Sequence, residues 1–171
     1  MSFLSSRSAR HDGSPGQPLP ELREGDPIPP RLLDESRPCR FCRLDPALTV
    51  ASNALAFALR DRFPVTHLHT LVLPRRHVVD YFSLSAEERE ACAELLHQLR
   101  ADILAADPLV VGFNIGMNVG GVAGQTVFHS HIHLIPRRTG DVEDPRGGVR
   151  MVIPGQGNRR LDVCPFQGQE G

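Results

Sequence analysis

Three histidines, His129, His131 and His133, alternate with other residues in one short run of the chain. In a β-strand, successive side chains point to opposite faces, so these imidazoles would share one face at spacings of about 6 to 7 Å. The other face would present Ile132 and Leu134 to a hydrophobic core. A strand that buries one face and lines the other with titratable nitrogens is suited to chemistry.

Two kinds of chemistry fit this face, and a third interpretation needs none. Neutral imidazole is the commonest transition-metal ligand, which allows a metal site, although neighbours along one strand face lie far apart for a single ion. Alternatively, the middle imidazole attacks phosphorus while its neighbours orient it or transfer protons. In the third interpretation the histidines are hydrogen-bonded residues of a polar surface. The three residues alone leave all three readings open.

The residues just before the histidine run favour phosphate. Gly124, Gln125 and Thr126 offer unhindered backbone N–H groups, an amide and a hydroxyl at the mouth of the histidine face. Such a set can hold phosphate oxygens without a metal ion.

One helix and several strands must position these residues. The helix begins at Ser85, which forms a capping box with Glu88, and runs to Asp107; it buries Cys92, Leu95, Leu96, Leu99 and Ile103 and leaves His97 in solvent. Strands are predicted over 53–60, 69–73, 112–118 and about 128–136, with a glycine-rich turn over 119–124. Strands interrupted by one long helix predict an α+β fold with an antiparallel sheet.

Composition sets the limits of the interpretation. The 171 residues suit one domain, and 19 basic against 20 acidic residues give no global field that would attract nucleic acid or an acidic membrane. No apolar run approaches the ~20 residues of a membrane span, so we expect a cytoplasmic protein with reduced cysteines. Proline-rich residues 1–36 and residues 151–171 are predicted as tails around a domain over 37–150.

The chain resembles the histidine triad (HIT) family of nucleotide hydrolases and transferases, whose motif alternates histidine with apolar residues. The run 129–135 matches that motif except at Ser130, which takes an apolar position. The resemblance extends through 61–64, 69–77, Asn118 and 124–128, and covers roughly residues 39 to 150. It implies a HIT-like fold of about five antiparallel strands, one long helix and a shorter helical segment.

The resemblance also implies a role for each matching residue. His131 would be the nucleophile that forms a covalent nucleotidyl-imidazole, with His129 and His133 as orienting and proton-handling partners. His69 matches the family's fourth histidine, and Asp61 matches the position that holds the ribose hydroxyls. Three further residues match positions near the phosphates: Asn118, Gln125 and Thr126.

The chain departs from the family pattern just before His69. Relatives often have Pro-Gly-His there, whereas this chain has His67-Leu68-His69. The small turn residue is lost, which leaves the shape of the loop and the placement of His69 to be determined.

Two cysteines, Cys39 and Cys42, form half of a zinc signature. Related proteins complete such a site with histidines that match His77 and His129. We therefore expect a structural zinc ion on Cys39, Cys42, His77 and His129; the alternative is two reduced surface cysteines, with His129 left for acid–base work.

The expected activity is hydrolysis at the α-phosphorus of an adenine nucleotide derivative, with release of AMP. Arg62 and the arginines of segment 137–150 favour a dinucleoside polyphosphate such as diadenosine polyphosphate, with Mg²⁺ alongside it, over a nucleoside phosphoramidate. A homodimer is expected by analogy with relatives. The rival hypotheses are a nucleotide-binding sensor with incidental turnover and a metal centre built on the three histidines.

Overall fold

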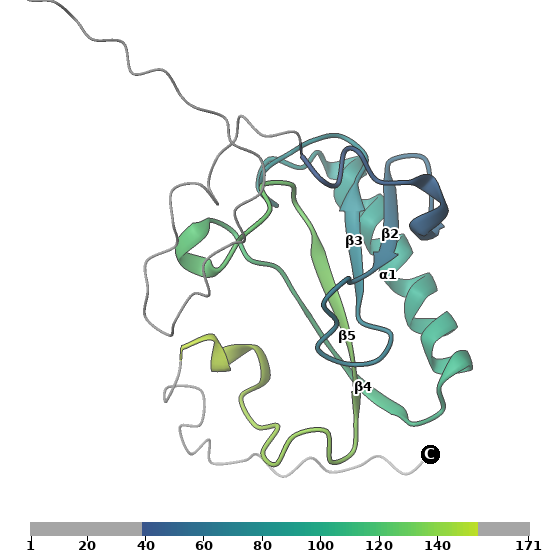
Figure 1. Ribbon diagram of the computed structural model, residues 1–171, viewed down its shortest axis with the longest axis vertical. Helices are drawn as coiled ribbons and strands as arrows, with labels where there is room; N and C mark the ends of the chain where they lie inside the picture. Colours follow the sequence, from purple (N-terminus) through teal and green to yellow (C-terminus); the bar gives the residue numbers. More distant parts are fainter. Residues whose placement is uncertain (1–38, 154–171) are drawn as a thin grey trace, which may run out of the picture.

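The computed structural model describes residues 39–153, so nearly all of both predicted tails lies outside the described residues. Five strands form one antiparallel sheet in the order β1-β2-β3-β5-β4 (Figure 1). The strands are β1 (Thr49–Ser52), β2 (Ala56–Arg60), β3 (Thr70–Pro74), β4 (Val110–Gly116) and β5 (Ile132–Arg138). The α+β fold with an antiparallel sheet is confirmed.

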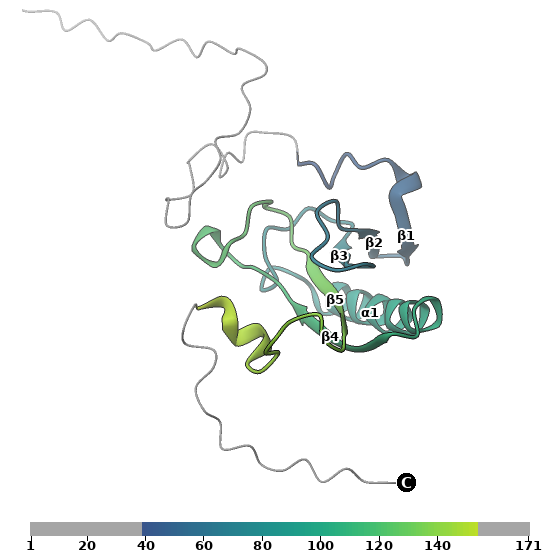
Figure 2. The same cartoon turned by 60° about the horizontal axis from the view of Figure 1, so that its bottom comes forward.

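Helix α1 (Ala86–Ala106) lies on one face of the sheet, against β1, β2 and β3 (Figure 2). Its start is set locally: the Ser85 hydroxyl accepts a hydrogen bond from the Glu88 N–H, and the Glu88 carboxylate accepts one from the Ser85 N–H. The predicted stripe faces the sheet, with Leu96 only partly buried, and His97 is exposed as expected. Within residues 39–153, no helix has the length and hydropathy of a membrane span.

The sheet has two chemically different faces. On the helix side, Ala56, Ala58, Val72 and Leu134 join the buried residues of α1 in one hydrophobic cluster. On the other side, a second hydrophobic cluster consists of Leu59, Leu71 and Leu73. Phe57 of β2 packs against it, as do Phe41 and Leu44, which precede β1. Because Leu71 pairs with His133, that histidine lies on the face away from α1.

The histidine run is only partly a strand, which corrects the predicted boundary near residue 128. β5 begins at Ile132, so His129 and His131 precede it. The backbone explains the difference, since the Ser130 N–H donates to the Val78 oxygen at 2.6 Å, outside the ladder of β5. Other boundaries moved less: β2 begins three residues later than predicted and ends at Arg60 as predicted, β3 is shifted by one residue, and β4 begins and ends two residues earlier. The short strand β1 was not predicted.

Candidate active site

The imidazole of His131 is oriented by the backbone of His129. Its Nδ1 lies 2.8 Å from the His129 carbonyl oxygen, so Nδ1 carries the proton and donates it. The other ring nitrogen, Nε2, then keeps its lone pair. The side chain is 8% exposed, and the Phe41 ring packs edge-on against it at 5.5 Å between centroids. A nearly buried imidazole with one nitrogen fixed and the other free is arranged as a nucleophile or base.

His133 and His69 form a second unit beside His131. Nε2 of His69 lies 3.0 Å from Nδ1 of His133, and the His131 and His133 ring centroids are 5.1 Å apart. The Val65 N–H donates to Nδ1 of His69 at 3.3 Å, so neutral His69 carries its proton on Nε2 and donates it to His133. Asp61 Oδ2 lies 3.5 Å from the same Nδ1.

Both histidines of this unit are held neutral. Burial lowers the pKa of His69, and the Asp61 carboxylate opposes that shift. Burial, followed by the neighbouring His131 and His69, lowers the pKa of His133 to about 4. At neutral pH the pair therefore consists of uncharged imidazoles joined by one hydrogen bond, which can transfer a proton without a standing charge.

His129 points away from this unit, toward the two cysteines. Its Nδ1 lies 3.6 Å from Cys39 Sγ and 3.5 Å from Cys42 Sγ, and Cys42 Sγ lies 3.3 Å from His77 Nδ1. One ligand atom from each residue fits within 4.8 Å of all the others. A tetrahedral zinc ion with bonds of about 2.0 to 2.3 Å requires ligand separations of roughly 3.3 to 3.8 Å.

The hydrogen bonding of His129 suits metal binding. Its ring is fully buried, and Nε2 donates to the Pro74 carbonyl oxygen at 2.9 Å. That bond places the proton on Nε2 and leaves the Nδ1 lone pair aimed at the cysteines, the usual arrangement of a metal-ligating histidine. The four residues expected to hold zinc are thus brought together, and His129 presents its unprotonated Nδ1 to the two cysteines.

The glycine-rich turn before the triad is shaped by Gln125. This side chain is 1% exposed; its oxygen accepts from Gly120 N–H at 2.8 Å, and its nitrogen donates to the Val79 and Val127 oxygens. Its amide groups are therefore occupied in holding the turn. Two other predicted phosphate residues are accessible: Thr126 is exposed, and half-buried Asn118 makes only a long 3.5 Å contact to Gly124.

The arginines after the triad are bound to carboxylates. Arg137 pairs with Asp141 at 2.7 Å and also donates to Asn114 at 2.6 Å, while Arg138 pairs with Asp107 at 2.6 Å. Further along the segment, Arg146 pairs with Asp144 at 2.8 Å. Two arginines that the sequence suggested for distal phosphates, Arg137 and Arg138, are therefore engaged within the fold, whereas Arg146 pairs locally and stays largely exposed.

Two groups near the histidines were not identified from the sequence. Phe41, between the cysteines, contacts the rings of both His129 and His131. Arg60 and Thr70 contact the backbone just before His69. The position of Phe41 within the Cys-x-x-Cys motif was an available signal, whereas the Arg60 contact depends on strand register.

Comparison with known proteins places this site in a family. The HIT domain model matches residues 44–140. An uncharacterised HIT-like protein of Mycobacterium tuberculosis is 39% identical over 110 residues, which are 61% of this chain and 74% of that protein. An adenosine 5′-monophosphoramidase of Schizosaccharomyces pombe is 33% identical over 103 residues, covering 58% and 74% of the two chains.

A solved structure shows the same fold. The zinc-bound histidine triad family protein of Mycobacterium smegmatis superposes with a TM-score of 0.56 at 34% identity, covering 60% of this chain and 77% of that one. The family model alone spans more than half of the chain and includes every residue of the histidine run. The chain therefore belongs to the HIT family.

Proposed function

We propose that the protein hydrolyses adenine nucleotide derivatives at the α-phosphorus through a covalent intermediate on His131. The observation that carries the proposal is the 2.8 Å bond from His131 Nδ1 to the His129 oxygen, which leaves Nε2 as the nucleophilic nitrogen. Membership in a family with a named adenosine 5′-monophosphoramidase supports the choice of substrate class.

The reaction has two balanced steps. In the first, Nε2 of His131 forms a bond to the α-phosphorus, and the bond to the leaving group breaks with its electron pair on that group. In the second, water attacks the same phosphorus, the N–P bond breaks, and AMP leaves with the histidine restored. The neutral His69–His133 pair is placed to exchange the protons that these steps require.

The nucleotide contacts are proposed residue by residue. Asp61 would hold the ribose hydroxyls, and Asn118 and Thr126 would contact phosphate oxygens. The two φ-positive glycines of the turn, Gly120 and Gly124, allow the backbone there a conformation that other residues rarely adopt. A Cβ at Gly124 would lie at ordinary contact distance, 3.7 Å, from the Asn118 side chain, so the turn lies beside Asn118.

We further propose a structural zinc ion on Cys39, Cys42, His77 and His129. The support is the set of Sγ to Nδ1 distances between 3.3 and 3.6 Å, together with the Pro74 bond that frees Nδ1 of His129. Zinc would fix the segment around Cys42 to the segment that leads into β5. On this proposal His129 serves catalysis through its backbone oxygen, which orients His131.

Two leaving groups remain as candidates. The sequence favours a dinucleoside polyphosphate, with Mg²⁺ as a companion ion, on the strength of its arginines. The ion pairs of Arg137 and Arg138 favour the second candidate, a nucleoside phosphoramidate or similar small leaving group, because those two guanidinium groups are engaged within the fold. We also retain a homodimer, which could form at either edge strand of the sheet, β1 or β4; β4 carries the exposed Val111 and Ile115.

The test is a side-by-side assay of adenosine 5′-phosphoramidate, adenylyl sulfate and diadenosine polyphosphates with purified protein. The proposal expects AMP from at least one substrate, and loss of about 10³-fold or more in turnover in His131→Ala. No hydrolysis of any substrate by the wild type, or full turnover by His131→Ala, contradicts it.

A further inference from the structure

The residue before His69 has an unusual backbone conformation. Leu68 has φ of +68°, and within residues 39–153 it is the only residue other than glycine with positive φ. Leucine is disfavoured there because its Cβ approaches the following carbonyl oxygen. The surrounding structure must therefore hold Leu68 in place, and its side chain packs against the helix-side hydrophobic cluster.

The carbonyl oxygen of Leu68 is held by two side chains. Arg60 NH1 donates to it at 3.2 Å, and Thr70 Oγ1 donates to it at 2.8 Å. Arg60 NH1 also donates to Thr70 Oγ1, so the three groups form a closed set. Thr70 is fully buried, and Arg60 and Thr70 are direct partners across β2 and β3.

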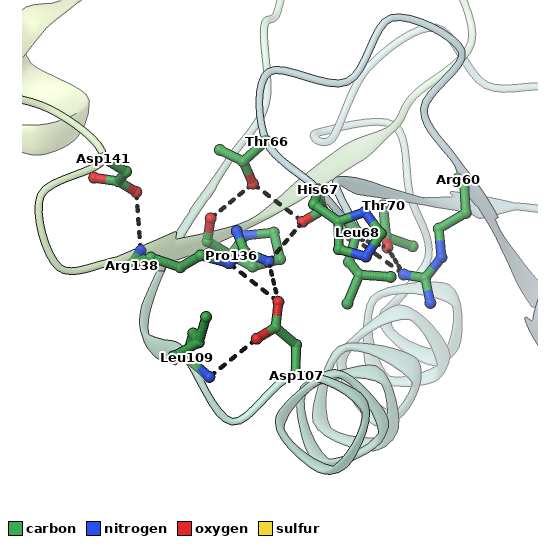
Figure 3. Close-up of polar contacts among 10 residues, drawn as sticks. All are labelled: Arg60, Thr66, His67, Leu68, Thr70, Asp107, Leu109, Pro136, Arg138 and Asp141. Atoms are coloured by element: carbon green, nitrogen blue, oxygen red, sulfur yellow. Dashed lines mark hydrogen bonds and ion pairs between the residues drawn. The ribbon is translucent and has the colours of Figure 1, made fainter.

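A second set of contacts holds the other side of the turn. Arg138 NH2 donates to the His67 oxygen at 3.3 Å while it is paired with Asp107 at the end of α1. Thr66 Oγ1 lies 2.8 Å from the Pro136 oxygen of β5. Figure 3 shows the turn between Arg60 on one side and Arg138 on the other, beside the end of α1.

His69 follows Leu68 directly and lies just before β3, which begins at Thr70. Its backbone N–H donates to the Thr66 oxygen at 3.1 Å, and its oxygen accepts from the Asp61 N–H at 2.9 Å. Its ring meets His133 at 3.0 Å. Together with these backbone bonds, the conformation of Leu68 sets the direction in which the chain enters β3 and therefore helps to orient the His69 side chain.

The groups that hold Leu68 lie on the opposite face from the histidines. Thr70 of β3 pairs with Arg60 of β2 on one side and with Leu134 of β5 on the other. Leu134 belongs to the helix-side cluster. Successive side chains of a strand alternate between faces, so Thr70 points away from the face of His69 and His133. A nucleotide bound at the histidines would not contact the Thr70 hydroxyl.

We infer that Arg60 and Thr70 are positioning residues for His69, acting through the carbonyl oxygen of Leu68. The inference rests on the proposed function insofar as His69 serves catalysis. These hydrogen bonds hold a leucine in a backbone conformation that glycine would adopt without strain. In this chain, Arg60 and Thr70 on the helix side of the sheet thereby influence the geometry of the His69–His133 pair on the other side.

The test uses Thr70→Val, which keeps the shape of the side chain and removes its hydroxyl, with Thr70→Ser as the rescue variant. Thr49→Val on edge strand β1 is the matched control. The first readout is the imidazole proton between His69 and His133 in ¹H–¹⁵N NMR spectra. We expect a downfield Nε2–H signal in wild type, Thr70→Ser and Thr49→Val, and its loss in Thr70→Val; an unchanged signal in Thr70→Val overturns the inference.

The second readout is turnover of adenosine 5′-phosphoramidate in single and double variants. Thr70→Val should lower kcat about tenfold with KM nearly unchanged, but by less than about twofold in a His69→Ala background, where nothing is left to position. An equal loss in both backgrounds overturns the inference. Should Thr70→Val not fold, Arg60→Met removes the other donor to Leu68 and is held to the same outcomes.

The two readouts also separate this inference from the proposed function. If wild-type protein hydrolyses none of the substrates, the proposed function fails, and the imidazole signal still decides whether Thr70 positions His69. If hydrolysis occurs and the signal is unaffected by Thr70→Val, the positioning inference alone fails.

Discussion

The His129 carbonyl oxygen accepts a hydrogen bond from the Nδ1–H group of His131 at 2.8 Å, so the backbone of one histidine orients the ring of the other. The side chain of His129, meanwhile, is directed to Cys39 and Cys42. On the function proposed above, adjacent histidines of the triad would have different tasks, His129 holding zinc and His131 attacking phosphorus. The backbone bond means that a displacement of His129 also displaces the His131 ring.

Replacing one cysteine of the predicted zinc site should remove the metal. Cys42→Ser is expected to lower zinc from about one ion per chain to well below that, and to reduce the free energy of unfolding by more than about 2 kcal/mol. Elemental analysis and denaturant unfolding measure the two effects. Cys92→Ala is the control, because Cys92 is buried between α1 and the sheet and is not one of the four predicted zinc ligands. Its loss should leave the zinc content unchanged. Full zinc content in Cys42→Ser would refute the site.

Ser130 gives a prediction of increased stability. Its hydroxyl is buried and, among the described residues, has no hydrogen-bond partner. Ser130→Ala removes that unpaired group and should raise the free energy of unfolding by about 1 kcal/mol. The exposed Ser52→Ala serves as a control expected to stay within about 0.5 kcal/mol of wild type. A clear loss of stability in Ser130→Ala would show that the hydroxyl does have a partner in solution.

The lowered pKa of His133 predicts acid sensitivity. Its pKa is about 4 in the folded protein against 6.5 for an ordinary histidine, so the unfolded chain takes up the proton first as the pH falls. Stability should therefore decrease between pH 6.5 and 4, by on the order of 3 kcal/mol from this group, and then level off. The groups that face it are His131 and His69, which add to the shift, and Asp61, which opposes it.

The measurement is urea unfolding at several pH values in wild type and His133→Gln. The variant should lose markedly less stability between pH 6.5 and 4. His97→Gln, altered at an exposed position of α1, should keep the wild-type slope. Identical slopes in wild type and His133→Gln would contradict the assignment.

Local features were the most predictable from the sequence. The capping box of Ser85 and Glu88 and the stripe through Leu95 and Leu99 depend on residues within a few positions of each other, and both are confirmed. The start of β5 was predicted too early because the Ser130 N–H bonds to Val78, a partner 52 positions away in the chain. Alternation in the sequence indicated a shared face but not where the ladder begins.

The sequence predicted which residues form the candidate site better than it predicted the contacts between them. The resemblance to a family named Cys39, Cys42, His77 and His129 together, and the structure brings them within reach of one ion. By contrast, Leu68, at a position where relatives often have glycine, predicted a changed turn but not the contacts that hold that turn. The Arg60 and Thr70 contacts arise from the register of β2 and β3, which no local pattern specifies.

Covalent nucleotidylation of His131 is best tested by intact mass spectrometry. Wild-type protein mixed with adenosine 5′-phosphoramidate is quenched within milliseconds in alkaline denaturant, which preserves an N–P bond, and then digested to locate the adduct. We expect AMP attached to His131 in wild type and no adduct in His131→Ala. AMP on another residue, or rapid hydrolysis with no adduct at any time, would contradict it.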